Sequence, residues 1–179
     1  MKFELKNSFT NIAYDATIIS LSNSLTFQEL CSVDCAEMAS KRIFIDTFEP
    51  PPLYGDTYTR GEIEKIFPCA LIHTSGYGSS FGREQAGVGI YHATGRIAIA
   101  IYVPVPKEYI QKHFITPTGI RILESIAGGI VMEMEKETKQ NDKQYLYFES
   151  CRISDTTVNP PEEQADIGAI AAIQIEFEY

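Results

Sequence analysis

The feature that most constrains this sequence is the run from Ile97 to Val105, where a large aliphatic residue stands at every second position. Side chains along a β-strand point alternately to opposite faces, so this period of two predicts a strand with one apolar face. That face would carry Ile97, Ile99, Ile101, Val103 and Val105, and the other Arg96, Ala98, Ala100 and Tyr102. Ala169–Tyr179 alternates similarly, with Ala171, Ile173, Ile175, Phe177 and Tyr179 set against Gln174, Glu176 and Glu178. A sheet with one buried face is therefore expected.

Two segments carry the helical period instead. Thr26 and Glu29 form a capping box, and an apolar stripe follows, which predicts a helix from Leu25 to about Ser40. A wide apolar face predicts a second helix that opens at Pro117 and Thr118 and ends within Thr138–Asp142. Its glycines, Gly128 and Gly129, each cost about 1 kcal/mol against alanine, so we interpret them as sites where the sheet backbone approaches.

The remaining segments complete a predicted α+β fold of one domain, residues 1–179. Further strands are expected at Arg42–Phe48, Ile66–Thr74 and Tyr145–Ile153, and a hairpin joins Val88–His92 to Ile97–Val105 through a turn at residues 93–96. Residues 76–87 and 154–166 are predicted to be long loops. Residues 1–25 form an N-terminal extension of weak pattern, in which Ala16–Leu21 favours a short strand. The sheet should be mainly antiparallel, with two principal helices packed on one face.

Composition excludes several classes of protein. A net charge of −9 and a pI near 4.8 disfavour a reader of nucleic acid that relies on overall basic charge. The longest uncharged apolar stretch, Ile97–Val105, is far shorter than the roughly 20 residues that a membrane helix needs. The first residues show no signal-peptide pattern, so we expect a soluble protein that is not exported by a cleaved signal.

The four cysteines are best interpreted as reduced, mostly buried thiols. The alternative is a metal site built from Cys31, Cys35, Cys69 and His73, but its spacing matches no known zinc finger. We therefore expect no metal and no cofactor.

No sequence motif assembles an active site. The histidines, His73, His92 and His113, are scattered, and the glycine-rich segment Gly76–Gly82 lacks the Gly-Lys-Ser/Thr ending of a phosphate-binding loop. Catalysis is not expected. The alternative is a small cytosolic enzyme or ligand-binding domain with a pocket between helix and sheet, near Cys69, His73 and Tyr102.

The last third of the chain resembles a known family. A helix (TPTGIRILESIAGGIVMEMEK), a strand (YLYFESCRISD), an acidic loop (PPEEQADIG) and a closing strand (AIAAIQIEFEY) succeed one another. This order is similar to the ends of tail terminator proteins of tailed bacteriophages and of related tail completion and head–tail joining proteins. The hairpin sequence GIYHATGRIAIAIYVPV also suits that pattern. The resemblance extends from Glu62 onward, whereas the first 60 residues and the Pro50–Pro52 loop depart from it.

The resemblance implies a structural subunit without catalysis that forms a ring, expected to be a hexamer. Such a ring caps the tail tube protein and meets the head connector protein, and its central hole is expected to let DNA pass. It would be found in the host cytoplasm during assembly and then in the virion tail or neck, with no membrane and no sequence-specific nucleic acid as partner. Another neck component, such as a connector or stopper, and a phage-derived bacterial contractile machine are the alternatives.

Candidate contact residues follow from this picture. The two predicted loops would meet partners through Gly76, Tyr77, Phe81, Arg83, Glu162, Glu163 and Asp166. A subunit contact or a lumen surface is expected for Arg96, Glu176 and Glu178, and the alternative for each is an ordinary solvated strand face.

Overall fold

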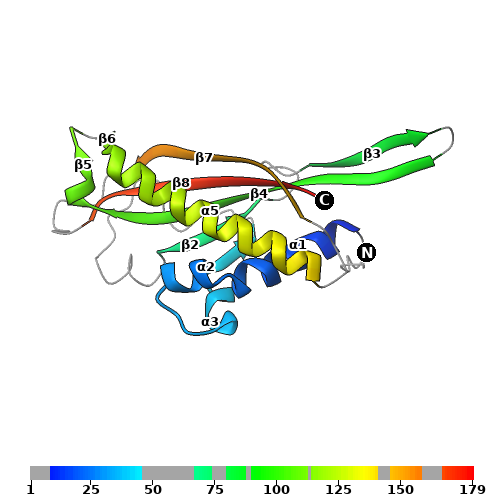
Figure 1. Ribbon diagram of the computed structural model, residues 1–179, viewed down its shortest axis with the longest axis horizontal. Helices are drawn as coiled ribbons and strands as arrows, with labels where there is room; N and C mark the ends of the chain where they lie inside the picture. Colours follow the sequence, from blue (N-terminus) through cyan, green and yellow to red (C-terminus); the bar gives the residue numbers. More distant parts are fainter. Residues whose placement is uncertain are drawn as a thin grey trace, which may run out of the picture.

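The structure is a computed structural model that describes residues 9–45, 67–73, 80–87, 90–112, 114–140, 146–158 and 167–179. It has the predicted α+β fold, in which a six-stranded sheet carries its helices on one face (Figure 1). The strand order is β1-β2-β4-β8-β7, and β3 also pairs with β4. Only β1 (Ile43–Ile45) and β2 (Cys69–Ile72) pair in parallel among the described strands, so the sheet is mixed rather than purely antiparallel.

The core of the sheet is the pairing of β4 (Ile90–Pro106) with β8 (Ile167–Glu178). Ile97 stands opposite Phe177, Ile99 opposite Ile175 and Ile101 opposite Ile173, all in one hydrophobic cluster with residues of the helices. Burial of this face is the main source of stability in a fold of this kind. The two alternating runs therefore form the predicted buried face.

The first helix, α1 (Phe9–Asn23), contradicts the short strand expected at Ala16–Leu21. Its buried positions include Ala13, Thr17, Ser20 and Leu21, at helical spacing but with small or hydroxyl-bearing side chains. Thr17 and Ser20 donate their hydroxyl protons to the carbonyls of Ala13 and Ala16, at 2.7 and 2.6 Å, which removes the cost of burying them. The apolar period that signals a helix is therefore missing from this one.

The helix expected from Leu25 to Ser40 is broken into α2 (Leu25–Leu30) and α3 (Ala36–Ser40). Its N-cap is Ser24, whose hydroxyl accepts the Phe27 N–H at 3.1 Å, rather than Thr26. Ser32 has a φ of 54°, the left-handed conformation that ends helices, and it separates Cys31 from Cys35. The two cysteines consequently do not share a helix face.

The longest of the described helices, α5 (Pro117–Gln140), begins and ends as predicted. Thr116 is its N-cap, with its hydroxyl accepting the Gly119 N–H at 3.3 Å. The prediction that the sheet backbone approaches Gly128 and Gly129 is wrong. A Cβ at Gly129 would lie 2.7 Å from the Thr26 hydroxyl of α2, whereas one at Gly128 would meet no described atom within 4 Å.

Glu133 joins α5 to the start of α2. Its carboxylate accepts the Ser24 hydroxyl at 2.6 Å, the Thr26 N–H at 3.0 Å and the Thr26 hydroxyl at 3.1 Å. Partial burial raises the pKa of this carboxyl, but the hydrogen bonds outweigh that effect and hold the pKa below its usual value. The ionised carboxylate thus satisfies groups at the N-terminal end of α2 that the helix itself leaves unpaired.

The loop predicted at residues 76–87 is wrong for residues 80–87, while residues 76–79 lie outside the described residues, and the turn predicted at residues 93–96 is wrong. Ser80–Gly87 forms strand β3, and residues 93–96 lie inside β4, with Phe81 opposite Gly95 and Arg83 opposite Ala93. Glycine and polar residues obscured the strand, because it pairs with a single neighbour and needs no apolar period. The loop expected at residues 154–166 is wrong for its first five residues, which belong to strand β7 (Tyr147–Val158), and residues 159–166 lie outside the described residues.

Two small elements complete the described chain. A 3₁₀ turn, η1 (Lys107–Tyr109), leads into a two-stranded ribbon of β5 (Ile110–Gln111) and β6 (Phe114–Ile115) before α5.

Candidate functional site

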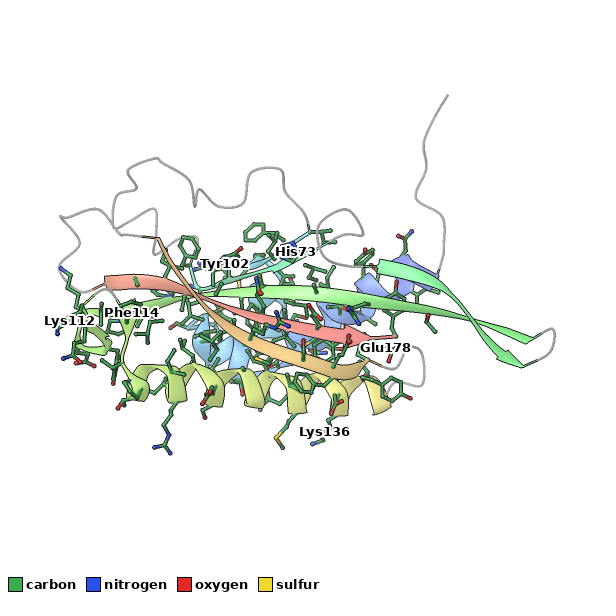
Figure 2. All side chains as sticks on the ribbon, turned by 90° about the horizontal axis from the view of Figure 1, so that it is seen from above. His73, Tyr102, Lys112, Phe114, Lys136 and Glu178 are labelled. Atoms are coloured by element: carbon green, nitrogen blue, oxygen red, sulfur yellow. The ribbon has the colours of Figure 1, made fainter. Side chains whose placement is uncertain are left out.

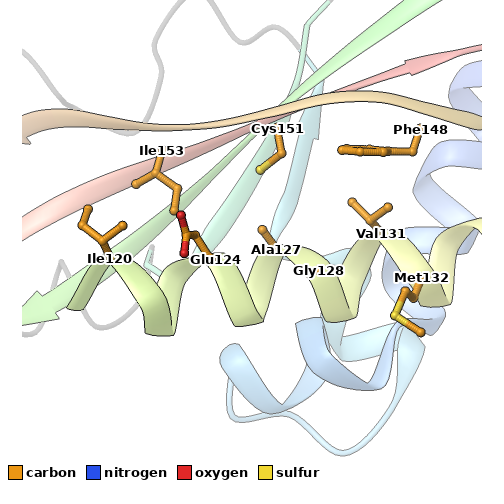
Figure 3. Close-up of a pocket in the computed structure, with 9 residues that line it drawn as sticks. All are labelled: Ile120, Glu124, Ala127, Gly128, Val131, Met132, Phe148, Cys151 and Ile153. Atoms are coloured by element: carbon orange, nitrogen blue, oxygen red, sulfur yellow. The ribbon is translucent and has the colours of Figure 1, made fainter. Parts of the chain in front are cut away.

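A groove of about 610 Å³ runs between α5 and the edge strand β7 (Figure 3). Its walls are mostly apolar and come from Ile120, Glu124, Ala127, Gly128, Val131, Met132, Phe148, Cys151 and Ile153. Figure 3 shows the β7 residues facing α5 across this space. The groove therefore lies on the helix-bearing side of the sheet, at its edge.

The local sequence explains why the groove is open. One helical stripe of α5 faces β7 and carries the small residues Ala127 and Gly128 at its middle, where a larger side chain would fill the space. At the rim, Met132 is 73% exposed and Phe148 is 42% exposed. Large apolar side chains exposed together around a cavity are characteristic of interaction surfaces.

The groove carries one charge among the residues that Figure 3 labels, the carboxylate of Glu124. No hydrogen bond or ion pair joins Glu124 to another of the described residues. Burial, and secondarily the Glu124 charge, raise the pKa of the Cys151 thiol in the same groove. An apolar groove with a single anion suits an apolar segment that carries a cation.

The outer edge of β7 has no strand beside it in the part of the chain that the structure describes. Such an edge presents unpaired backbone groups and pairs readily with another strand. At its start, the Phe148 N–H donates to the Glu135 carboxylate of α5 at 3.0 Å. This backbone donor is therefore already satisfied within the subunit. Register shifts after Phe148 and after Ser154 bound the regular stretch Ser150–Ser154.

The second notable surface is the arm, defined as β3 and the first part of β4, residues 80–95. It projects beyond the rest of the sheet in both views (Figures 1 and 2). Pairing with β8 begins only at Arg96, so along the arm β4 pairs with β3 alone. At the root of the arm, the backbone groups of Gly95 and Tyr179 exchange two hydrogen bonds of 3.0 and 2.9 Å.

The three strand residues predicted as contacts are brought together, but within one subunit. Arg96 pairs with Glu149 and approaches Glu176 to 4.0 Å, and the Ser150 hydroxyl donates to Glu176 at 3.3 Å. Glu178 stands opposite Arg96 in register and is exposed. These charges lie on the sheet face opposite the one that packs against the helices, because their neighbours Ile97 and Phe177 point into the core.

The other predicted contact residues divide into two groups. Phe81 and Arg83 lie in strand β3 of the arm rather than in a loop. The remaining five lie outside the described residues: Gly76, Tyr77, Glu162, Glu163 and Asp166.

The alternative pocket was expected near Cys69, His73 and Tyr102. Cys69 stands opposite Tyr102 in register, and the Tyr102 ring meets Phe67 edge-on with centroids 6.3 Å apart. Figure 2 places Tyr102 and His73 on the side of the sheet away from α5, so they are not part of the groove. Burial raises the pKa of the Cys69 thiol to about 12, which keeps it protonated at neutral pH and unsuited to nucleophilic attack.

The remaining thiols also bear on the metal alternative. Cys31 is buried, with its pKa raised to about 11 by burial, and it contacts the Pro68 carbonyl at 3.6 Å, whereas Cys35 is exposed. No group of three or more potential metal ligands occurs within the described ranges. Across the same ranges, no helix is both long and apolar enough to cross a membrane.

Sequence reasoning missed the groove. Gly128 was the available signal, but a glycine in a helix is equally consistent with close packing, which is what its neighbour Gly129 provides. Comparison with known proteins adds no second line of evidence, since no family model and no curated protein matches the chain.

Proposed function

We propose that this protein is a structural subunit that works by self-association into a ring of the tail terminator type. In that role the ring caps a tail tube and joins it to a head connector, without catalysis. The observation that carries the proposal is the combination, on one chain, of a projecting arm and an open apolar groove on a different surface. Two unlike surfaces that fit each other link copies head to tail, and such contacts generate rings when the rotation closes.

Several features support an assembly role over a chemical one. Exposed apolar side chains at the groove, such as Met132 and Phe148, favour a protein surface as partner. The Cys69 thiol, which lies where the alternative pocket was expected, is buried, and burial raises its pKa to about 12, so it is protonated at neutral pH. The acidic composition, with a net charge of −9, suits a ring through which DNA slides without adhering.

The partners and location proposed here come from the family resemblance in the last third of the chain. They are further copies of this chain, expected to number six, together with a tail tube protein and a head connector protein. The place of action would be the host cytoplasm during assembly and the neck or tail of the virion afterwards.

Light scattering behind a sizing column, at low and physiological salt, tests the proposal, together with electron microscopy of the same fractions. The expected result is a mass near six subunits and ring-shaped particles with a central hole. Closed dimers, or a monomer at every concentration, would contradict a self-assembling ring and would favour the enzyme or ligand-binding alternative.

A further inference from the structure

We propose that the groove between α5 and β7 is the docking site for the arm of a second copy of this chain. In this arrangement strand β3 of one copy continues the sheet of the next copy beyond β7. The inference rests on the self-association in the proposed function and adds the two surfaces that meet. It also implies that each copy uses its own arm and groove with different neighbours.

Two strand edges of the described chain are open and can pair with each other across two copies. Within the described chain, β7 pairs only with β8, and β3 pairs only with β4, so each has one edge without a partner. Addition of a strand to such an edge satisfies backbone donors and acceptors on both sides. The regular stretch Ser150–Ser154 of β7 is long enough for this pairing. It begins after Phe148, whose N–H already donates to Glu135.

The groove has a shape that a strand beside β7 would cover. Phe148, Cys151 and Ile153 line it from β7, and they share the face of the sheet that packs against the helices. A strand added beside β7 would place every second residue on that same face, over the groove mouth. The open space at Gly128 and the exposed Met132 and Phe148 would then be covered.

The groove and the arm also carry residues of opposite charge. Glu124 is the charged residue of the groove, and no described residue forms an ion pair with it. The arm contains a single lysine or arginine, Arg83, which stands opposite the small Ala93, while Glu84 stands opposite His92. Consecutive strand positions alternate between the two faces of a β-ribbon, so positions 83 and 84 belong to different faces of the arm. The sequence thus offers a cationic residue at a position of one arm face and the groove offers one anion.

The contact is also asymmetric, which matters for the ring. The arm and the groove are different surfaces, so the pair is heterologous and each docking leaves a free arm and a free groove. Growth then stops only when the last arm meets the first groove. The contact proposed here therefore permits a closed ring in which each copy binds two different neighbours.

The test uses the full chain and five variants, with mass measured by light scattering over a range of concentrations. Glu124→Arg and Arg83→Glu are each expected to weaken association by roughly tenfold or more, and the double exchange is expected to restore it. Gly128→Leu fills the groove without meeting any described atom at its Cβ, so it should fold yet fail to associate. Lys136→Glu changes an exposed charge of α5 outside the groove lining and serves as the control.

A second readout locates the contact. Cys151 lines the groove and is exposed, and Cys35 is exposed elsewhere, so both react with an alkylating reagent in the monomer. Docking should slow alkylation of Cys151 roughly tenfold when nine-tenths of the copies are associated, and leave Cys35 unchanged. Circular dichroism of each variant confirms that lost association does not reflect lost folding.

The outcomes separate the two proposals. If every groove variant forms rings with the mass and the Cys151 reactivity of the wild type, the docking site is overturned and the ring proposal stands. Association that depends on the Arg83–Glu124 pair but grows into open chains would support the docking site and contradict the ring. A wild-type chain that stays monomeric, with Cys151 equally reactive at all concentrations, would overturn the docking site.

Discussion

The two long sides of α5 differ sharply, although they belong to the same helix. Toward α2, a Cβ at Gly129 would lie 2.7 Å from Thr26, and Glu133 accepts three hydrogen bonds from Ser24 and Thr26. Toward β7, Gly128 adjoins open space, and Glu124 has no hydrogen-bond partner among the described residues. The two adjacent glycines therefore have different roles. Gly129 allows α5 to pack closely against α2, whereas Gly128 leaves the groove open toward β7.

This difference separates the requirements of folding from those of assembly. A surface that is complete within the subunit is expected to lose stability when changed, because its contacts form on folding. A surface that awaits a partner is expected to tolerate change in the monomer. The following experiments test that contrast, beginning with the largest expected effect.

Replacing Glu133 with alanine should cause the largest loss, about 2–3 kcal/mol of unfolding free energy, because three hydrogen bonds to a charged acceptor disappear. The measurement is urea unfolding followed by circular dichroism. Glu124→Ala, on the groove side of the same helix, is the matched control and should stay within about 0.5 kcal/mol of wild type. Equal losses in the two variants would remove the distinction between the two sides.

Gly129→Ala should destabilise the fold by about 1–2 kcal/mol, since the new methyl group displaces Thr26 from its contacts with Glu133. Thermal unfolding measures the change. A rise in melting temperature would mean that the Thr26 side chain moves aside at no cost. The close approach of Thr26 would then not be the reason why residue 129 is a glycine.

Gly128→Ala should act in the opposite direction and stabilise the monomer by about 0.5–1 kcal/mol, because alanine favours the helix and its methyl group has space. The same thermal measurement applies, with Gly129→Ala as the paired variant. A destabilised Gly128→Ala would show that the groove is closed in solution.

Acidification should produce the smallest effect, a decline in the contribution of Glu133. Its pKa lies below the usual value in the folded state, so the ionised form stabilises the fold fully above the unfolded pKa. That contribution is lost as the pH falls below about 4.5 and through the folded pKa. The stability gap between wild type and Glu133→Gln, measured in urea at several pH values, should narrow over that interval. A gap independent of pH would contradict the role of the ionised carboxylate.

The sequence predicted the parts of the fold that follow from apolar periodicity. Ile97–Val105, Ala169–Tyr179 and the helix that opens at Pro117 all bury a regular stripe, and each occurs where the pattern indicates. The pattern failed where burial does not require large apolar residues. Helix α1 buries Thr17 and Ser20, and strand β3 has glycines at positions 82 and 87, so neither carries a periodic signal.

The candidate site was harder to predict for a geometric reason. The groove combines α5 residues with β7 residues, and sequence spacing does not reveal how far a helix stands from a neighbouring strand. Arg83 and Phe81 were expected to contact partners, and they do lie in the arm, but as strand residues. Contact with a partner remains a prediction for both. Arg96 and Glu176 were found in an ion-pair cluster of their own subunit.

The continuity of β4 has a consequence for the angle between neighbours in an assembly. Its 17 residues, about 55 Å at strand spacing, pass from the sheet centre into the arm without interruption. Gly95 and Tyr179 bind reciprocally where the arm leaves the sheet. The direction of the arm is therefore set by the twist of the subunit's own core strand rather than by a hinge. A seated arm would transfer that direction to the next subunit, so the number of copies that complete a circle would be encoded in the curvature of one strand.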